Sequence, residues 1–245
     1  MDEAFHRLLP PAAWLAALWT AESFAGIVPR RHTERIRHAG RNLALAAVNG
    51  ATLFFTLGAL SIWVGIVSPV TVPPRWTLAH TVVCFLALDL YSYAWHRLMH
   101  AVPALWRLHE VHHSDDRMDA TTSGRFHVCE LALAGTVRLP LLFVLGATPA
   151  TLLVYETALV GVSMFHHANL SLGSTDRFLR LAIASPRMHS IHHSRDAVDF
   201  GTNYGSVLSI WDRVFRTFRI TDGPIIHGLD ERDDDPFPTL LRRPF

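Results

Sequence analysis

Three histidine motifs constrain the fold of this chain more than any other feature. His96 and His100 form an HxxxH pair, and residues 109–113 form an HxxHH motif. Residues 189–193 repeat the HxxHH pattern about eighty positions downstream. Positions three and four apart share one face of a helix, so each motif directs its imidazoles to one side. Imidazoles that converge usually bind a metal ion, and the fold must then bring the three motifs together.

A single HxxxH pair is weak evidence for a metal site, because a buried histidine is more often a hydrogen-bonded core residue than a ligand. Two HxxHH motifs and an HxxxH pair in one chain of 245 residues are much harder to assign to packing. Cys84 and Cys129 are too few and too scattered to form a thiolate site or a disulfide framework. Metal chemistry in this chain therefore depends on histidine nitrogen.

The composition indicates a membrane protein. Half of the residues are apolar, 18% are charged and the formal net charge is +1, which gives no argument for a nucleic-acid partner. Several apolar segments have about the length that a membrane helix needs. One of them runs for 26 residues without any charge. The segments are residues 10–29, 42–67, 76–95, 131–146 and 150–167.

We therefore expect an all-α integral membrane bundle of about four to five transmembrane helices. Residues 1–75 are expected to form N-terminal anchor helices, residues 76–220 the catalytic domain and residues 221–245 a C-terminal tail. The segment 10–29 is expected to be an anchor rather than a secretory signal, because it lacks a cleavage site of small residues. Whether this first segment crosses the bilayer is left open.

The arginines predict the orientation in the membrane. A basic loop between the first two segments contains Arg30, Arg31, Arg35, Arg37 and Arg41, and such loops stay cytoplasmic. If the later segments cross in turn, every histidine motif emerges on the cytoplasmic side. Further arginines fall on that side: Arg97, Arg107, Arg117, Arg125, Arg177, Arg180 and Arg187. We expect a multi-pass protein with its metal site facing the cytoplasm.

The links between segments give local expectations. The proline-rich residues 68–75 interrupt the helix before residue 76. Residues 146–149 are a short link that predicts an antiparallel hairpin of the fourth and fifth segments. Arg138 and Glu156 lie on its two arms, so we expect them to pair. Residues 203–219 are amphipathic, which fits a helix at the membrane surface or a buried helix of a cytosolic cap.

Ten histidines can meet at the cytoplasmic rim. Adjacent residues of a helix differ in direction by about 100°, so the two neighbours in each HxxHH motif can serve different metal ions. Ten ligands shared by two ions gives five each, which suits six-coordinate iron better than zinc, although zinc and manganese stay open. The proposed ligands are His96, His100, His109, His112, His113, His127, His167, His189, His192 and His193.

Other polar residues near the motifs are candidates for supporting the ligands or lining a substrate path. Asp89 and Tyr93 share a helical stripe with His96 and His100, although core packing explains them equally well. Asn169 and Asn203 are further candidates. Four aspartates that follow the HxxHH motifs can orient the ligand rings or cap helices, namely Asp115, Asp116, Asp119 and Asp196.

The ordered set of motifs resembles the sterol desaturase and fatty acid hydroxylase superfamily. The resemblance rests on HRLMH, HEVHH and HSIHH, with RFH, FHHAN, NYG and WDRVFRTF between and after them, and it covers about residues 85–218. Two positions depart from the family pattern. The family commonly has glycine where Arg216 stands and proline where Val128 stands.

The resemblance implies an integral membrane enzyme with a cytosolic helical cap and a non-haem di-iron site that uses dioxygen. It carries the role of metal ligand onto the histidines of the three motifs and, less firmly, onto His127 and His167. The chain lacks an HPGG haem-binding segment, so electrons are expected from a separate cytochrome b5-like protein, ferredoxin or reductase.

The expected activity is hydroxylation or desaturation of a lipid, such as a sterol or a fatty acyl chain, that enters from the bilayer. One alternative is a zinc-dependent membrane hydrolase acting on a lipid ester, which would need a carboxylate base near the metal. A second is a non-enzymatic metal carrier, which would place histidines or acids deep within several membrane segments. The clusters here collect instead at one rim.

Overall fold

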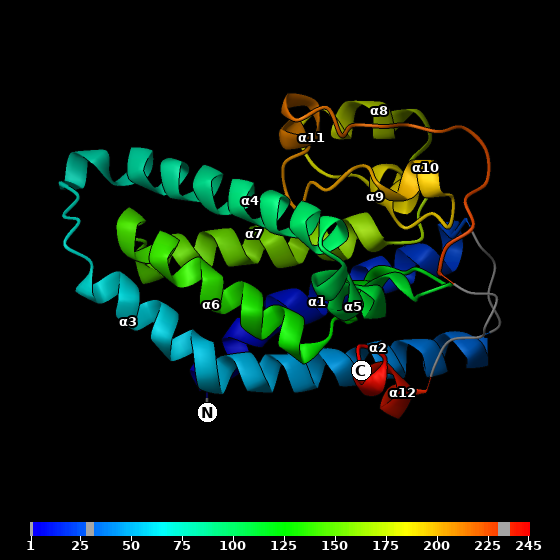
Figure 1. Ribbon diagram of the computed structural model, residues 1–245, viewed down its shortest axis with the longest axis horizontal. Helices are drawn as coiled ribbons and strands as arrows, with labels where there is room; N and C mark the ends of the chain where they lie inside the picture. The colour runs from blue at the N-terminus through cyan, green and yellow to red at the C-terminus, as the bar shows by residue number, and fades with distance from the viewer. Residues whose placement is uncertain (1, 28–31, 230–235) are drawn as a thin grey trace.

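The fold is an elongated bundle of long helices with a group of short helices at one end (Figure 1). A computed structural model describes residues 2–27, 32–229 and 236–245. These residues form helices joined by turns and extended links, with isolated bridges in place of a sheet. The expected all-α class is therefore confirmed. The long helices are α1 (Asp2–Ala25), α2 (His32–Leu53), α4 (Thr77–Ala101), α6 (Val128–Leu145) and α7 (Pro149–His167), and the shorter α3 (Ala59–Val67) follows α2 after one helical turn.

The short helices collect where α4 and α7 end, and four of them follow α7 in the chain (Figure 1). They are α5 (Pro103–His113), α8 (Asp176–Leu179), α9 (Pro186–His192), α10 (Ala197–Phe200) and α11 (Ile210–Val214). The C-terminal α12 (Phe237–Arg242) packs on α2. Single turns of tighter or wider helix complete the chain: η1 (Phe54–Gly58), η2 (Pro74–Trp76), η3 (Ala120–Gly124) and η4 (Gly173–Thr175).

Two stretches of helix are long and apolar enough to cross a membrane. They are Pro74–Ala101, which includes α4, and Val128–Leu145, which is α6. Most of their apolar residues are not covered by the rest of the protein, as expected for helices in contact with lipid. Spans at α1, at α2 with α3, and at α7 stay predictions.

The prediction of a basic loop before residue 42 is wrong for residues 32–41, which are helical. Helix α2 already begins at His32, so Arg35, Arg37 and Arg41 lie on this helix. No proline or turn signal interrupts residues 32–39, and the helix therefore extends beyond the apolar segment. Arg30 and Arg31 lie outside the described residues.

The link between α6 and α7 forms as expected. Gly146 ends α6 in the left-handed conformation, with φ of 60°, and the hydroxyl of Thr148 caps α7 before Pro149. A side chain at Gly146 would collide with Val70, because an added Cβ would lie 2.6 Å from the Val70 Cβ. The arms then diverge (Figure 1), since α6 packs on α2 and α3 whereas α7 packs on α1 and α4.

The expected single helix over residues 203–219 is wrong. Only α11 is helical there, because Asn203 and Arg216 have left-handed φ values of 58° and 59°. The carboxylate of Asp212 folds the segment back on itself, accepting hydrogen bonds from the backbone N–H of Tyr204 and of Gly205 at 2.7 and 2.9 Å. The result is a compact loop rather than a surface helix.

A buried polar network joins α2 to the residues that follow α5. The two ring nitrogens of His38 face carboxylate oxygens of Asp115 at 2.8 Å and of Asp119 at 3.2 Å. Burial alone would lower the pKa of His38, but these two carboxylates raise it to about 10. Burial alone would raise the pKa of Asp115, yet His38 and Arg125 hold it well below its usual range. The network is therefore ionised.

The guanidinium of Arg125 completes this network from the other side. It is fully buried, and it donates hydrogen bonds to the carbonyl of Val111 at 3.1 Å, to the side-chain oxygen of Asn42 at 3.2 Å and to the hydroxyl of Ser114 at 3.0 Å. The C-terminal end of α5, which carries two HxxHH histidines, is thereby fixed against α2.

The His38 ion pairs predict that stability depends on pH. Because the folded-state pKa of about 10 lies above the ordinary 6.5, the stabilisation is complete below about pH 6.5 and is lost as the pH rises toward 10. The free energy of unfolding in detergent should fall by roughly 2–4 kcal/mol between pH 7 and pH 10. His38→Gln should be less stable at pH 7 and lack this slope. Equal slopes in both proteins would contradict the assignment.

The left-handed conformation at Arg216 predicts a stabilising substitution. Glycine adopts this conformation without a steric cost, so Arg216→Gly should raise the free energy of unfolding by about 0.5–1 kcal/mol after its greater unfolded-state entropy is subtracted. Arg216→Ala is the matched control, because it retains the Cβ and should give no gain. Chemical denaturation of the three proteins in detergent measures the difference, and a gain for both variants would point to the arginine side chain instead.

Candidate metal centre

Nine of the ten histidines proposed as ligands meet in two buried clusters. In each cluster, one ring nitrogen from every histidine lies within 4.8 Å of those of the others. The rings come from the end of α4, from α5, from the end of α7 and from α9 with the residue after it. Cluster 1 is His96, His100, His109, His113 and His192, and cluster 2 is His112, His167, His189 and His193.

The HxxHH motifs divide between the clusters as the helical geometry predicts. His112 faces cluster 2 whereas its neighbour His113 faces cluster 1, and His192 and His193 divide in the opposite order. The clusters are adjacent, since the rings of His113 and His193 stack with centroids 4.2 Å apart. The α5 motif and the α9 motif therefore each supply histidines to both clusters.

The ring nitrogens of cluster 2 face one another around a common point. The Nε2 atom of His112 lies 3.1 Å from the Nε2 atoms of both His167 and His193. The Nε2 atom of His189 lies 2.9 Å from that of His167 and 3.1 Å from that of His193. The Nδ1 atom of His167 lies 2.7 Å from the carbonyl of Ser163, to which it donates, so its Nε2 atom carries a lone pair. Four converging nitrogens fit a metal ion.

Hydrogen bonds at the far side of three rings orient cluster 1. The Nδ1 atom of His96 donates to the carbonyl of Tyr204 at 3.0 Å. The Nδ1 atom of His109 donates to Oε1 of Glu130 at 2.8 Å, and that of His192 donates to the carbonyl of Thr202 at 2.7 Å. Within the described residues, the Nε2 atom of each ring is buried without a hydrogen-bond partner. This tautomer presents a lone pair to a metal ion.

Burial keeps five of these imidazoles neutral. It lowers the pKa of His113, His189 and His193 well below the usual value, and neighbouring imidazoles lower it further. Burial likewise lowers the pKa of His112 well below the usual value and that of His192 to about 3. A neutral imidazole is the form that binds a metal, so metal binding by these histidines does not compete with protons near pH 7.

His127 lies outside both clusters, so the structure does not bring this expected ligand together with the other nine. Its Nδ1 atom accepts a hydrogen bond from the backbone N–H of Cys129 at 3.2 Å and so caps α6. Its Nε2 atom lies 3.2 Å from the carbonyl of Leu241. Glu130, three residues after His127 and in the first turn of α6, instead reaches the site and holds the ring of His109.

Asp89 and Tyr93 contact the loop over residues 203–219 rather than the histidine clusters. Asp89 accepts hydrogen bonds from the backbone N–H of Val207 and Leu208 and from the indole of Trp211, at 2.8–3.2 Å. The hydroxyl of Tyr93 lies 2.9 Å from that of Thr217. Both therefore secure the segment that carries the Tyr204 carbonyl, the acceptor of the His96 ring.

The two asparagines also have structural partners. The side-chain amide of Asn203 donates to the carbonyls of Met188 and Arg219, at 3.1 and 2.7 Å. These hydrogen bonds hold the residue in its left-handed backbone conformation after α10. The backbone N–H of Asn169 donates to Glu22 at 2.8 Å. Of the aspartates, Asp119 caps η3 and Asp196 caps α10.

Sequence reasoning missed two features of the site. Glu130 was recognisable only as a carboxylate three residues after His127, and the backbone carbonyls that orient His96 and His192 leave no trace in the side-chain pattern. His166 is also buried beside cluster 2, with its ring centroid 3.9 Å from that of His189. It lies beside His167 at the end of the apolar segment 150–167, and the sequence leaves open which of these two neighbours faces the site.

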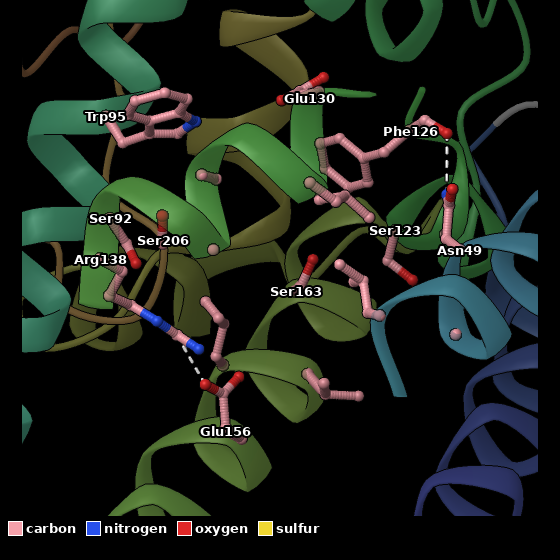
Figure 2. A pocket seen from close by; sticks show the side chains of 18 of the residues that line it. Asn49, Ser92, Trp95, Ser123, Phe126, Glu130, Arg138, Glu156, Ser163 and Ser206 are labelled. Atoms are coloured by element: carbon pink, nitrogen blue, oxygen red, sulfur yellow. Dashed lines mark hydrogen bonds and ion pairs between the residues drawn. The ribbon is translucent and has the colours of Figure 1, made fainter. Parts of the chain in front are cut away.

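A cavity of about 1000 Å³ leads from the histidines between the long helices. Six histidines form its inner end: His96, His109, His112, His166, His167 and His189. Helix α7 lines the cavity from Pro149 in its first turn to His167 in its last, and α2, α3, α4 and α6 supply the other walls. Figure 2 shows part of this lining, including the ion pair between Arg138 and Glu156 at 2.6 Å. The expected pairing of these residues is thus confirmed.

The chain is similar to several lipid hydroxylases. It is 33% identical over 147 residues to the ornithine lipid hydroxylase OlsE of Rhizobium tropici, a match that covers 60% of this chain and 44% of that protein. It is 29% identical to the alkylglycerol monooxygenase of Homo sapiens over 59% of this chain and 32% of the relative. It is also 29% identical to the cholesterol 25-hydroxylase of Homo sapiens over 60% and 54%.

The matched region spans about a third to a half of these curated relatives. No solved structure matches the chain. Residues 81–217, more than half of the chain, match the family described as fatty acid hydroxylase and include both clusters. The chain therefore belongs to the fatty acid hydroxylase family, within the sterol desaturase and fatty acid hydroxylase superfamily.

Proposed function

We propose that this protein is a membrane enzyme that hydroxylates a lipid with dioxygen at two iron ions held by nine histidines. One observation carries the proposal: two buried histidine clusters lie side by side at the inner end of a largely apolar cavity. Each cluster offers only imidazole nitrogens as ligands from the protein. A pair of iron ions, when bound there, supplies the activation of dioxygen.

The protein's own part is to hold and shield the ligands. Cluster 1 offers five nitrogens and cluster 2 offers four, so six-coordinate ions in both would each keep at least one position free. Glu130 and the carbonyls of Thr202 and Tyr204 fix three rings in the tautomer that presents Nε2. The burial of every ring except the partly covered His96 and His100 excludes water from the ions.

The cavity supports a lipid as the substrate. Its walls come from α2, α3, α4, α6 and α7, of which α4 and α6 qualify as membrane helices. A lipid that enters between the diverging α6 and α7 can place an unactivated carbon near the histidines while its remaining chain stays in an apolar environment. The named activities of the relatives, two hydroxylases and a monooxygenase, favour hydroxylation over desaturation.

The membrane arrangement and the electron source complete the proposal. We place the protein as a multi-pass membrane protein with its clusters on the cytoplasmic side, because arginines gather at the end of the bundle that carries them. The oxidation needs electrons, which a separate cytochrome b5-like protein, ferredoxin or reductase supplies.

Isotope labelling tests the reaction class. Membranes containing the protein and a reductase partner, incubated under ¹⁸O₂, should form a lipid that has gained one labelled oxygen atom, as detected by mass spectrometry. A lipid ester hydrolase would work without dioxygen and reductant and would take its oxygen from water. A product that forms in nitrogen, or that carries no label, would refute the proposal.

Substitution of one ligand in each cluster tests the site. His112→Ala and His192→Ala should each lower turnover by about a hundredfold or more, because each removes a ligand from an ion that the other histidines hold incompletely. His80→Gln is the control, since His80 bonds only to groups at the start of α4 and the end of α6, away from the clusters. Activity and iron content of the purified proteins are measured together, and full activity of His112→Ala or His192→Ala would contradict the assignment.

Glu130 should tune the ligand that it touches. Glu130→Gln keeps the shape of the side chain but removes the charge that polarises His109, so iron affinity or activity should fall by about ten- to a hundredfold. A chelator titration of the iron-loaded protein measures the affinity. Glu110→Gln removes a carboxylate near Arg243 at the surface of α5 and should behave like the unaltered protein. Equal effects of both substitutions would show that only net charge matters.

A further inference from the structure

A charged pair stands in the wall of the otherwise largely apolar cavity. Arg138 reaches from α6 and Glu156 from α7, with 2.6 Å between Arg138 Nη1 and Glu156 Oε1 (Figure 2). Both residues line the cavity. Charges within membrane helices are costly, so they usually serve a partner or a ligand. The proposed reaction at the histidines does not use this pair.

The pair has hydrogen-bonding capacity left over. A guanidinium has five N–H donors, and Glu156 is the partner that Arg138 has among the described residues. The Nε atom of Arg138 is buried without an acceptor there. The side chain of Glu156 is 40% exposed, so part of its carboxylate faces open space.

The hydroxyl groups nearest along α4 are already satisfied. The hydroxyl of Tyr91 donates to the carbonyl of Ala134 at 2.6 Å, and the hydroxyls of Ser92 and Tyr155 bond to each other at 2.6 Å. Unfilled hydrogen-bonding capacity remains at the charged Arg138–Glu156 pair, as it does at the neutral Trp95 Nε1 and Asn49 Oδ1 elsewhere in the lining. A molecule in the cavity that brings a polar group to the pair gains hydrogen bonds that an apolar molecule lacks.

The chemistry of the pair selects the kind of polar group. Its net charge is zero, so an anionic group near Arg138 would also meet the repulsion of Glu156. A hydroxyl can accept from the guanidinium and donate to the carboxylate at the same time. A hydrocarbon satisfies neither. The pair thus suits an uncharged lipid that carries a hydroxyl.

The pair lies well away from the clusters. Arg138 is eight residues beyond Glu130 on α6, which corresponds to about 12 Å of helix. Glu156 is eleven residues before His167 on α7, or about 16 Å. We propose that the Arg138–Glu156 pair binds a hydroxyl of the lipid substrate and so directs a carbon remote from that hydroxyl to the histidines. The placement of that carbon rests on the proposed function, whereas the binding of the hydroxyl does not.

Competition binding tests the inference without any turnover. Radiolabelled hexadecanol bound to the full-length protein in detergent is displaced by unlabelled hexadecanol, hexadecane or hexadecanoate at equal mole fraction, in the absence of dioxygen and reductant. Hexadecanol should compete about tenfold better than either of the others, as expected for one or two hydrogen bonds to charged groups. A protein that binds in this way but oxidises no lipid would refute the proposed function and leave this inference standing.

Two double variants serve as matched tests. Arg138→Met with Glu156→Met leaves no unpaired charge and should lose the preference for the alcohol, while an unchanged melting temperature shows that it folds. Arg138→Glu with Glu156→Arg restores a pair and should retain the preference. Equal competition by the alcohol and the hydrocarbon, or a preference that survives in the double methionine variant, would overturn the inference. Strongest competition by hexadecanoate would identify an anion site and overturn it as well.

Discussion

The packing of nine imidazoles into two small volumes is the constraint on which this structure depends. A buried nitrogen lone pair without a partner costs about 1–3 kcal/mol, and the Nε2 atoms of cluster 2 lie about 3 Å from one another. Protons cannot satisfy them all, because burial and mutual repulsion keep rings such as His113 and His193 neutral. The two clusters could each hold a metal ion, which would resolve this conflict, and the remaining structure fixes the orientation of the rings.

The supporting structure works through elements outside the histidine motifs. The ionised network of His38, Asp115 and Arg125 fixes the end of α5, which supplies both clusters. The loop over residues 203–219 supplies the Tyr204 carbonyl to His96 and is itself held by Asp89 and Asp212. Helices α6 and α7 separate from their shared turn and leave the cavity between them. These elements support the histidine rings although they contribute few of the nine ligands themselves.

Much of this arrangement could be predicted from the sequence, because it follows from local periodicity. Adjacent histidines of an HxxHH motif point in different directions from one helix, so the division of His112 and His113 between the clusters was predictable. The pairing of Arg138 with Glu156 followed from the cost of isolated charge in an apolar helix. The sequence does not distinguish the cap role of His127 from a ligand role, because that role depends on its position directly before α6. The fold of residues 203–219 also failed, since Asp212 overrides the amphipathic pattern through contacts that depend on the tertiary structure.

Anomalous diffraction at the iron absorption edge tests the central claim most directly. Crystals of the protein purified with its native metal should show two peaks, one among the Nε2 atoms of His112, His167, His189 and His193, and the other among the nitrogens of cluster 1. His127 should lie apart from both. A single peak, a signal at the zinc edge alone, or ions bound away from these nitrogens would contradict the account.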